Sequence, residues 1–388
     1  FDPSMFVHFR KRFPLSEIQR INEEVIQRGL EDAKDPEDSK PPENGSTSER
    51  PDNPDTSHKT ISNCGKLIVD ATCAPADIAY PTDINLLNES REKAEEIIDT
   101  LHSPFIGINR KPRTYRQVAR KRYLNAAKSR SLSKRKLHKA IGRQLRFLRR
   151  DFQHIEKLSS QTDLSVLSRR QYRDLLVIQE VYRQQEILYR TRSKRIPDRI
   201  VSISQPHVRP IVRGKAGTPT EFGAKISASL TSGYVSLDRL SWSPYNESGD
   251  LISQTEAFKV RFGHYPASIH ADKIYRNRGN RMYCKERSIR LSGPPLGRPS
   301  KQSGDMAAQK KQHRQDELDR IAIEGKFGQG KRRFSLDRVM TKLATTSETA
   351  IAITFLVLNL EKMLRDFLYS FLWRYTTTLN CMAYNKAA

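Results

Sequence analysis

Two aspartates and one glutamate stand where catalytic carboxylates could meet. Asp70 directly follows the apolar run "LIV", and Asp272 directly follows "ASIHA", so each closes what reads as a buried strand. Sites in open α/β sheets assemble where strands end, and we therefore expect these two carboxylates to lie together. Glu324, on a polar helix and four residues after Arg320, would supply a third carboxylate.

Three carboxylates would form an all-oxygen site suited to Mg²⁺ or Mn²⁺. Two such ions about 4 Å apart can activate a water molecule or a 3′-OH and stabilise the leaving oxygen during in-line attack on a phosphodiester. Arg320 would orient Glu324 from one helical turn away, and Lys331 would contact a DNA phosphate. The residue types and their spacing thus indicate metal-dependent chemistry on a phosphodiester.

Simpler roles compete with this interpretation. A single aspartate after a strand is more often a turn or helix-cap residue than a metal ligand. We interpret Asp77 as a turn residue and Asp83 as the N-cap of a helix expected over residues 86–101. His270 and His207 have apolar neighbours and are expected to be strand residues rather than ligands.

The third carboxylate depends on a helix that contains three glycines. The run "EGKFGQGK" begins at Glu324, and glycine weakens a helix interior. We therefore expect a polar helix over residues 306–323 to stop at Glu324 and another helix to begin near Ser335. The glycines do not form a phosphate-binding P-loop, because the Lys-Ser/Thr pair and a preceding strand are missing.

The chain is strongly basic. Its 388 residues carry 69 Lys and Arg against 44 Asp and Glu, a net charge of +25 that predicts a polyanionic partner, nucleic acid before an anionic membrane. The longest apolar run, "AIAITFLVLNL", is too short to cross a membrane and reads as a buried helix. The four cysteines form no CxxC pair, which favours a reducing cytoplasm over a disulfide framework.

The positive charge is concentrated in one segment, Arg110 to Arg150, which contains seventeen Lys or Arg and no acid. A narrow apolar stripe predicts a helical hairpin from about residue 113 to residue 192. A surface that only faces solvent would not need this excess of Lys and Arg over acids, so we expect the hairpin to bind DNA phosphates. The candidate DNA-binding residues are Arg143, Arg146, Arg149 and Arg150 in this segment, and Arg320 and Lys331 near the carboxylates.

Composition divides the chain into six parts. We expect the end of an N-terminal helical module over residues 1–31, a disordered linker over 32–60, the first part of a catalytic core over 61–108, a basic helical insertion over 109–199, the rest of the core over 200–348 and C-terminal helices over 349–388. A capping box of Ser16 and Gln19 would begin the first helix. Strands are expected at "RIVSIS", "RPIVRG", "AKISASLTSG" and "YVSLDRLSW", before a helix over residues 250–262. This order indicates an α/β core interrupted by an insertion.

Several blocks of the chain resemble a known family. "LIVDATCAPADIAYPTDINLLNESREKAEEIID", "VRPIVRGKAGTPTEFGAKISASL", "YPASIHADKIYRNRGNR" and "IEGKFGQGKRRFSLDRVMTKL" are similar to blocks of bacterial insertion-sequence transposases of the DDE type. The resemblance implies an RNase H-like mixed sheet flanked by helices and interrupted by the basic hairpin. It also implies that Asp70, Asp272 and Glu324 are the catalytic acids and the metal ligands.

One position of the family's Tyr-Arg-Glu-Lys signature differs in this chain. Arg320, Glu324 and Lys331 match the signature, whereas Glu317 stands in place of the tyrosine. Glu317 therefore stays open as an alternative third acid. Relatives carry a further helical region ahead of "FDPS", which we expect this chain, beginning with Phe, to lack.

The resemblance implies an enzyme that nicks DNA at insertion-sequence ends and joins the freed 3′-OH to target DNA with Mg²⁺ or Mn²⁺. Its expected partners are the transposon ends and the target DNA, with several copies of the chain assembled on them at the bacterial nucleoid and no membrane. Two alternatives stay open. One is a non-catalytic nucleic-acid-binding protein, including a decayed transposase that keeps the fold, and the other is an RNase H-like nuclease that cuts without joining.

Overall fold

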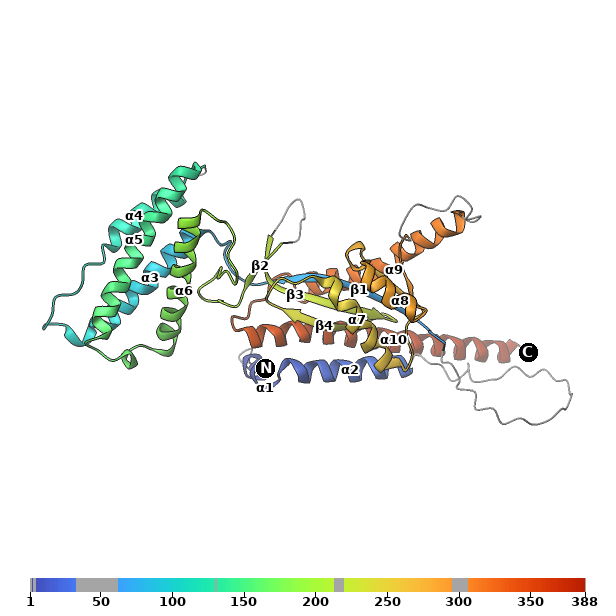
Figure 1. Cartoon of the computed structure of the whole chain (residues 1–388). Helices are drawn as coiled ribbons and strands as arrows, with labels where there is room; N and C mark the ends of the chain where they lie inside the picture. Colours follow the sequence, from blue (N-terminus) through green and yellow to red (C-terminus); the bar gives the residue numbers. More distant parts are fainter. Residues whose placement is uncertain are drawn as a thin grey trace, which may run out of the picture.

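The computed structural model describes residues 2, 5–32, 62–129, 131–212, 220–294 and 306–387. These residues form a mixed sheet with helices on both faces, and a helical bundle stands at one end of the sheet (Figure 1). The predicted α/β class, with a mixed sheet flanked by helices, is confirmed. The predicted linker lies outside the described residues from residue 33 onward.

The strands of the sheet are β1 (Lys66–Pro75), β2 (Arg209–Val212), β3 (Thr220–Thr231), β4 (Tyr234–Ser241), β5 (Ser268–Ala271) and β6 (Arg290–Leu291). Their order is β2-β3-β1-β5-β6, with β4 also paired to β3. β1 runs antiparallel to β3 but parallel to β5, and β5 is parallel to β6. The central strand β1 therefore joins an antiparallel half of the sheet to a parallel half.

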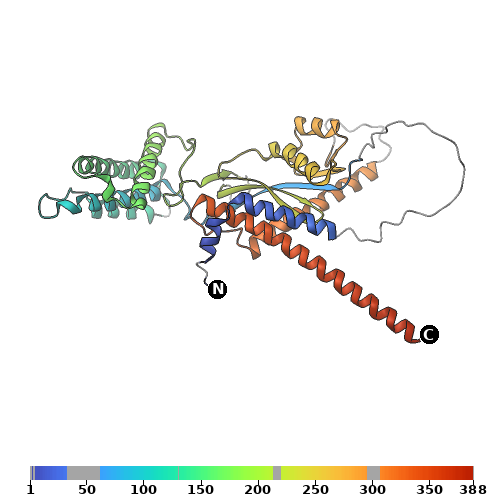
Figure 2. The same ribbon diagram turned by 90° about the horizontal axis from the view of Figure 1, so that it is seen from below.

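The helices that cover the sheet are α2 (Leu15–Asp32), α7 (Asp250–Phe262), α8 (Arg278–Glu286), α9 (Met306–Arg333) and α10 (Ala344–Ala387), and α1 (Met5–Arg12) contacts α10. α7 and α8 pack on one face, and α2, α9 and α10 pack on the other. α7 spans the residues that the sequence predicted. α10 continues well past the sheet (Figure 2). In the part of the chain that the structure describes, no helix combines the length and the apolar composition needed to cross a membrane.

β1 is buried on both faces, as its apolar run predicts. Leu67 and Val69 belong to the core beneath α7 and α8, whereas Ile68 belongs to the core beneath α9 and α10. The predicted end of this strand at Asp70 is wrong, because β1 stays paired with β3 as far as Pro75. Asp70 is a mid-strand residue, and only the pairing of β1 with β5 ends just before it.

One predicted strand is an irregular segment. Residues 199–204, "RIVSIS", form no strand, although Ile200 and Ile203 are buried. The backbone N–H of Ile200 donates to Oε1 of Gln184 at 2.9 Å, so a side chain satisfies the group that a neighbouring strand would otherwise bind. His207, also expected in a strand, lies in the turn before β2.

The first residues of α2 differ from the predicted capping box. α2 begins at Leu15, so Ser16 lies inside its first turn rather than at the N-cap. Nε2 of Gln19 donates to the backbone oxygen of Leu237 at 3.1 Å. The predicted role of Gln19 is therefore wrong, because this side chain joins α2 to β4.

The bundle consists of α3 (Asp83–His102), α4 (Arg116–Ala127), α5 (Lys134–Ser159) and α6 (Arg169–Thr191). It has its own apolar core, in which Leu101, Leu148 and Ile178 are fully buried. The region of the predicted hairpin holds three helices, α4, α5 and α6, rather than two, and α3 packs against all three. Thr82 rather than Asp83 is the N-cap of α3, and Asp83 is its first residue.

Candidate active site

The three predicted acids line one pocket. It has a volume of about 610 Å³ and is lined by Asp70 from β1, Asp272 from the end of β5 and Glu324 from α9. Arg320 and Lys331, the predicted partners on α9, line the same pocket. The fold therefore brings together residues from three distant parts of the sequence.

The register of the sheet explains why Asp70 and Asp272 meet. β1 and β5 are parallel, and Val69 pairs with Ala271. The next residue on each chain segment is an aspartate, so the two aspartates stand at the same level of neighbouring strands. Because side chains alternate along a strand, Asp70 shares the face of Ile68, on which α9 packs.

α9 carries Glu324 on an unbroken helix of 28 residues. The predicted stop at Glu324 is wrong, because α9 continues through all three glycines to Arg333. Its packing on the sheet, where Ile323 and Phe327 are buried, outweighs the low helix propensity of glycine.

Ion pairs hold α9 against the sheet one to two turns before the pocket. Arg290 binds Asp316 through two hydrogen bonds of 2.8 and 2.9 Å, and Lys66 binds Asp319 at 2.7 Å. His270, a buried residue of β5, lies beside both acids, and its Nδ1 is 3.6 Å from Oδ1 of Asp316. His270 is a strand residue, as predicted. These contacts fix the position of α9 along the strands, and therefore the place on the sheet that the following residues of α9 face.

Arg320 links two of the acids. Its Nη1 donates to Oδ1 of Asp272 at 2.8 Å, and its Nη2 donates to Oε1 of Glu324 at 3.1 Å. Oδ1 of Asp272 also accepts from the backbone N–H of Lys273 at 2.7 Å, as the cap of the short helix η5 (Lys273–Tyr275). Arg320 thus orients Asp272 as well as Glu324.

Asp70 is the most buried of the three acids. Burial raises the pKa of its carboxyl to about 6, against the lowering effects of Arg320 and of the Ala71 N–H, which donates to Oδ1 at 2.8 Å. The nearby carboxylates of Asp272 and Glu247 also raise this pKa. A cation beside Asp70 would offset the cost of ionising it here.

Carboxylate oxygens are the donors that Mg²⁺ and Mn²⁺ prefer, so the donor set of the pocket fits these ions. Across the described residues, however, no three acidic, histidine or cysteine side chains are grouped closely enough to hold a metal ion. Arg320 gives a physical reason, because its guanidinium binds both Asp272 and Glu324. Metal ligation by these acids stays a prediction, and it requires Arg320 to release them.

Glu317, the alternative third acid, lies elsewhere on α9. It is exposed and does not line the pocket, whereas Glu324 does. The two positions are about two helical turns apart, which corresponds to roughly 10 Å along the axis. The geometry therefore favours Glu324 over Glu317.

Two charged residues of the pocket were missed by the sequence reasoning. Lys225 on β3 and Glu247 in the short helix η4 (Glu247–Gly249) line the pocket and form an ion pair of 2.6 Å. Nζ of Lys225 also donates to the backbone oxygen of Tyr245 at 2.8 Å. The available signal was "YNESGD" just before α7, but a single acid in a polar loop reads equally well as a turn residue.

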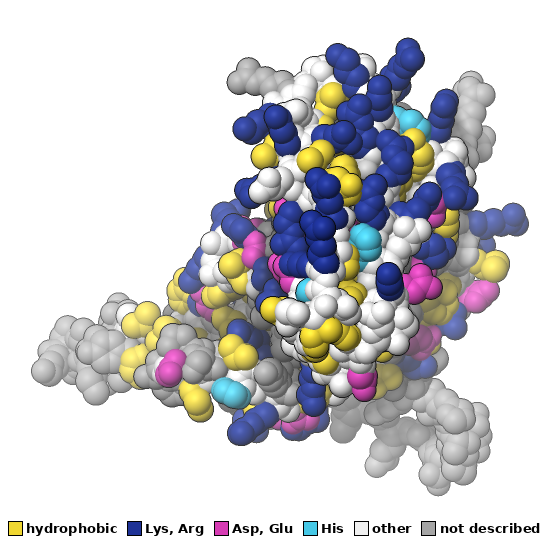
Figure 3. Space-filling model, turned by 90° about the vertical axis from the view of Figure 1, so that its left-hand side faces the viewer, with side chains coloured by type: hydrophobic (Ala, Val, Ile, Leu, Met, Phe, Trp, Pro, Cys, Tyr) yellow, Lys and Arg dark blue, Asp and Glu magenta, His cyan; other side chains and the backbone are white. Residues whose placement is uncertain are grey.

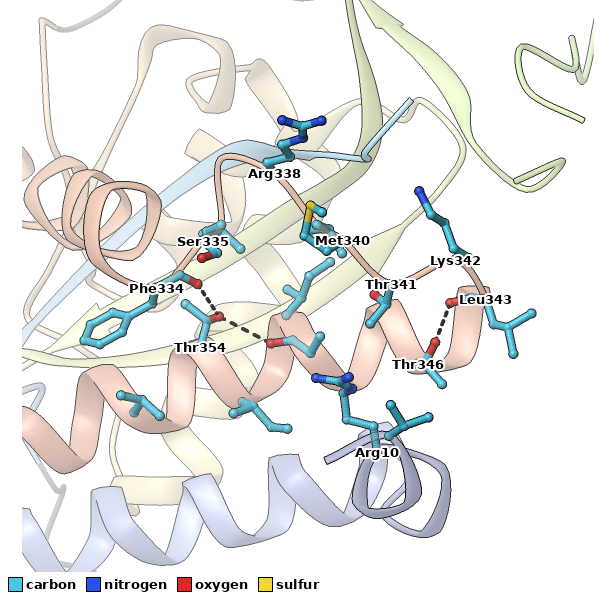
Figure 4. Close-up of a pocket in the computed structure, with 17 residues that line it drawn as sticks. Arg10, Phe334, Ser335, Arg338, Met340, Thr341, Lys342, Leu343, Thr346 and Thr354 are labelled. Carbon is cyan, nitrogen blue, oxygen red and sulfur yellow. Dashed lines mark hydrogen bonds between the residues drawn. The ribbon is translucent and has the colours of Figure 1, made fainter. Parts of the chain in front are cut away.

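A larger cavity, of about 740 Å³, lies between α1, the loop after α9 and α10 (Figure 4). Arg338 and Lys342 lie at its edge, and both bind Asp77, at 2.6 and 2.8 Å. Asp77 thus anchors the loop after α9, a role beyond the predicted turn. None of the described residues that line this cavity is acidic, so we do not place the predicted chemistry there.

Lys and Arg side chains cover much of the outer end of the bundle (Figure 3). The predicted DNA-binding residues Arg143, Arg146, Arg149 and Arg150 all lie on α5. Arg146 is exposed, whereas Arg149 forms an ion pair of 2.6 Å with Glu186, and the Arg150 guanidinium lies 4.8 Å from the centre of the Tyr115 ring. The four arginines therefore differ in how readily they can reach a ligand.

Further exposed cations were not singled out from the sequence. They are Arg120, Lys121 and Arg122 on α4, and Lys134, Arg135, Lys136 and Lys139 in the first turns of α5. The composition of the segment predicted a basic surface, but it could not show which of its cations face solvent.

The fold and the pocket define a mixed α/β protein with carboxylates gathered at neighbouring strands and on a facing helix. Residues 269–361 match the family model described as "Transposase DDE domain". The match supports a DDE-type transposase. It includes Asp272, Glu324 and the whole of α9, while Asp70 lies before it. Comparison with the curated proteins and with the solved structures gives no match.

Proposed function

We propose that the chain is an insertion-sequence transposase that cleaves DNA at the ends of its element and joins the freed 3′-OH to target DNA. The observation that carries this proposal is the convergence of Asp70, Asp272 and Glu324 on one pocket, with Arg320 bonded to two of them. The family match over residues 269–361 supports the same chemistry.

The three acids would hold Mg²⁺ or Mn²⁺ in this pocket. When bound, such ions activate the attacking oxygen and stabilise the leaving oxygen of the phosphodiester. Arg320 and Lys331 would then bind the phosphate, since a guanidinium that leaves two carboxylates keeps its donors for another oxyanion. Asp70, which is half-buried on β1, would contribute its carboxylate from the sheet side of the pocket.

The bundle would bind the flanking DNA through phosphate contacts. Its surface carries exposed cations on α4 and α5, and contacts of this kind weaken steeply as salt displaces them. Because an element has two ends, we expect at least two copies of the chain to act together on DNA. The partners are therefore the element ends, the target DNA and a second copy of this chain.

A strand-transfer assay tests the proposal. The substrate is a duplex with the terminal sequence of the element that encodes the chain, here called the end duplex, mixed with supercoiled target DNA and Mg²⁺. We expect cleavage of the end duplex and its covalent joining to the target. Binding without cleavage would favour a nucleic-acid-binding protein or a decayed transposase, and cleavage without joining would favour a nuclease.

A further inference from the structure

Lys225 is a cation held inside the pocket of acids. Its side chain is 15% exposed, and it lies opposite Cys73 in the pairing of β3 with β1. Cys73 lines the pocket three residues beyond Asp70. Because side chains alternate along a strand, Lys225 lies on the α7 face of the sheet and reaches the pocket from the face opposite to that of Asp70.

Two acceptors fix the position of the Lys225 ammonium. Nζ lies 2.6 Å from Oε2 of Glu247 and donates to the backbone oxygen of Tyr245 at 2.8 Å. Both acceptors come from the segment that leads from β4 into α7, so one short piece of chain orients the group. An ammonium has three N–H donors, and these two contacts leave one for a ligand.

The charges of the pocket indicate that the ligand of this N–H donor is a phosphate. Asp70, Glu247, Asp272 and Glu324 place four carboxylates around the cavity, and a DNA phosphate that enters it is repelled by each of them. Cations within the same walls must offset that repulsion. Lys225 is one of them and, unlike Arg320, it does not bind any of the three predicted catalytic acids among the described contacts.

We propose that Lys225 binds a phosphate of the DNA strand that enters the pocket, and that Glu247 and the Tyr245 carbonyl position its ammonium. The inference rests on the proposed function for the identity of the substrate. Lys225 would touch the substrate directly, whereas Glu247 would be a positioning residue. In the competing explanation, the ion pair only ties β3 to η4 and contacts no ligand.

The test removes the two charges of the ion pair separately. Lys225→Met removes the cation with little change in shape, Lys225→Arg keeps the charge, and Glu247→Gln releases the ammonium. Lys259→Met, on the exposed surface of α7 and outside the pocket, is the matched control. The DNA is a set of end duplexes, each with one neutral methylphosphonate at a successive phosphate across the cleavage position, and binding and single-turnover cleavage are both measured.

We expect Lys225→Met to weaken binding or cleavage by about 10- to 100-fold, the usual effect of removing a hydrogen bond to a charged group. At one phosphate, the methylphosphonate should weaken binding or cleavage by the unaltered chain by a similar factor. The same methylphosphonate should cause no further loss in Lys225→Met, because the contact it removes is already missing. Lys225→Arg should recover most of the loss, Glu247→Gln should show a partial loss at the same phosphate, and Lys259→Met should match the unaltered chain.

If the effects of Lys225→Met and of the methylphosphonate were additive at every phosphate, the proposal would be overturned, because no phosphate would then be a partner of Lys225. A loss of thermal stability in Lys225→Met with an unchanged phosphate pattern would assign the ion pair a structural role only. A further outcome is that Glu247→Gln changes the Mg²⁺ concentration that cleavage requires and has no effect at the phosphate that Lys225 binds. That result would overturn the positioning role of Glu247. Binding is measured separately, so failure of the unaltered chain to cleave would count against the proposed function and not against phosphate binding by Lys225.

Discussion

Arg320 donates a hydrogen bond of 2.8 Å to Asp272, which lies 48 positions earlier in the chain. The same guanidinium binds Glu324, so it occupies two acids that a metal ion would need. We predict that Arg320→Ala binds Mn²⁺ more tightly than the unaltered chain in the absence of DNA, because the competing cation is gone. Calorimetric titration measures this, with Arg333→Ala as a control that breaks an ion pair outside the pocket. Weaker or equal Mn²⁺ binding by Arg320→Ala would mean that the acids are not the metal ligands.

The identity of the third acid gives a second prediction. Glu324 lines the pocket and Glu317 does not, so Glu324→Gln should abolish Mg²⁺-dependent cleavage of the end duplex while Glu317→Gln should keep it. The two variants remove the same charge from the same helix, and each serves as the control for the other. The opposite pattern of activity would assign the role to Glu317.

The basic bundle gives a third prediction. Charge reversal at Arg143, Arg146 and Arg149 should weaken DNA binding and flatten its dependence on salt, with a change in slope of about 0.9 for each phosphate that the variant no longer binds. Arg146→Ala alone should have a larger effect than Arg149→Ala, because Arg149 already binds Glu186. Dissociation constants measured at several salt concentrations give the slope.

An exposed site on the same bundle provides the control for that experiment. Arg183 on α6 forms an ion pair of 2.6 Å with Glu180, and Arg183→Glu should leave the salt slope close to that of the unaltered chain. If the triple charge reversal left the slope unchanged as well, α5 would not belong to the DNA interface.

A buried acid in the bundle predicts how stability depends on pH. Asp151 is fully buried on α5, and neither of its carboxylate oxygens has a hydrogen-bond partner among the described residues. Burial raises its pKa to about 8; the charge of Glu95 adds to the rise, and Arg91, Arg150 and Arg116 oppose it. In the unfolded chain this carboxyl ionises near pH 4. The folded state should therefore lose stability as the pH rises from about 4 to about 8, since the unfolded state releases the proton first.

Asp151→Asn removes the group that titrates. We expect the variant to lose less stability over that pH range and to be more stable than the unaltered chain at pH 9, by up to about 5 kcal/mol. Denaturant unfolding at pH 5, 7 and 9 measures the difference. Glu156→Gln, at an exposed position of the same helix, is the control and should keep the original pH dependence. Parallel stability curves for all three proteins would contradict the assignment.

The parts of the fold that depend on local pattern could be predicted from the sequence. The apolar run before Asp70 predicted a strand buried on both faces, and α7 has the predicted residues 250–262. The course of α9 could not be predicted, because glycine propensity is local information, whereas the burial of Ile323 and Phe327 depends on the sheet beneath them. The prediction of a strand at "RIVSIS" failed for a similar reason, since the Ile200 N–H binds a distant side chain, that of Gln184, rather than a neighbouring strand.

In the candidate site, too, the features set by local sequence pattern could be predicted and those set by tertiary contacts could not. Asp70 and Asp272 could be singled out because each follows an apolar run, although Asp70 turned out to be a mid-strand residue. Their meeting depends on the parallel register of β1 and β5, which no local pattern specifies. Lys225 and Glu247 were missed because their pairing joins β3 to η4, and nothing in either segment alone indicates the other.

Cleavage of the end duplex by chains that lack one acid tests the central claim most directly. We predict that Asp70→Ala and Asp272→Ala each abolish Mg²⁺-dependent strand cleavage and keep DNA binding in a gel shift, because the acids serve the chemistry while the bundle serves binding. Asp337→Ala, which removes an exposed acid outside the pocket, should cleave like the unaltered chain. Full cleavage by either Asp70→Ala or Asp272→Ala would contradict the account.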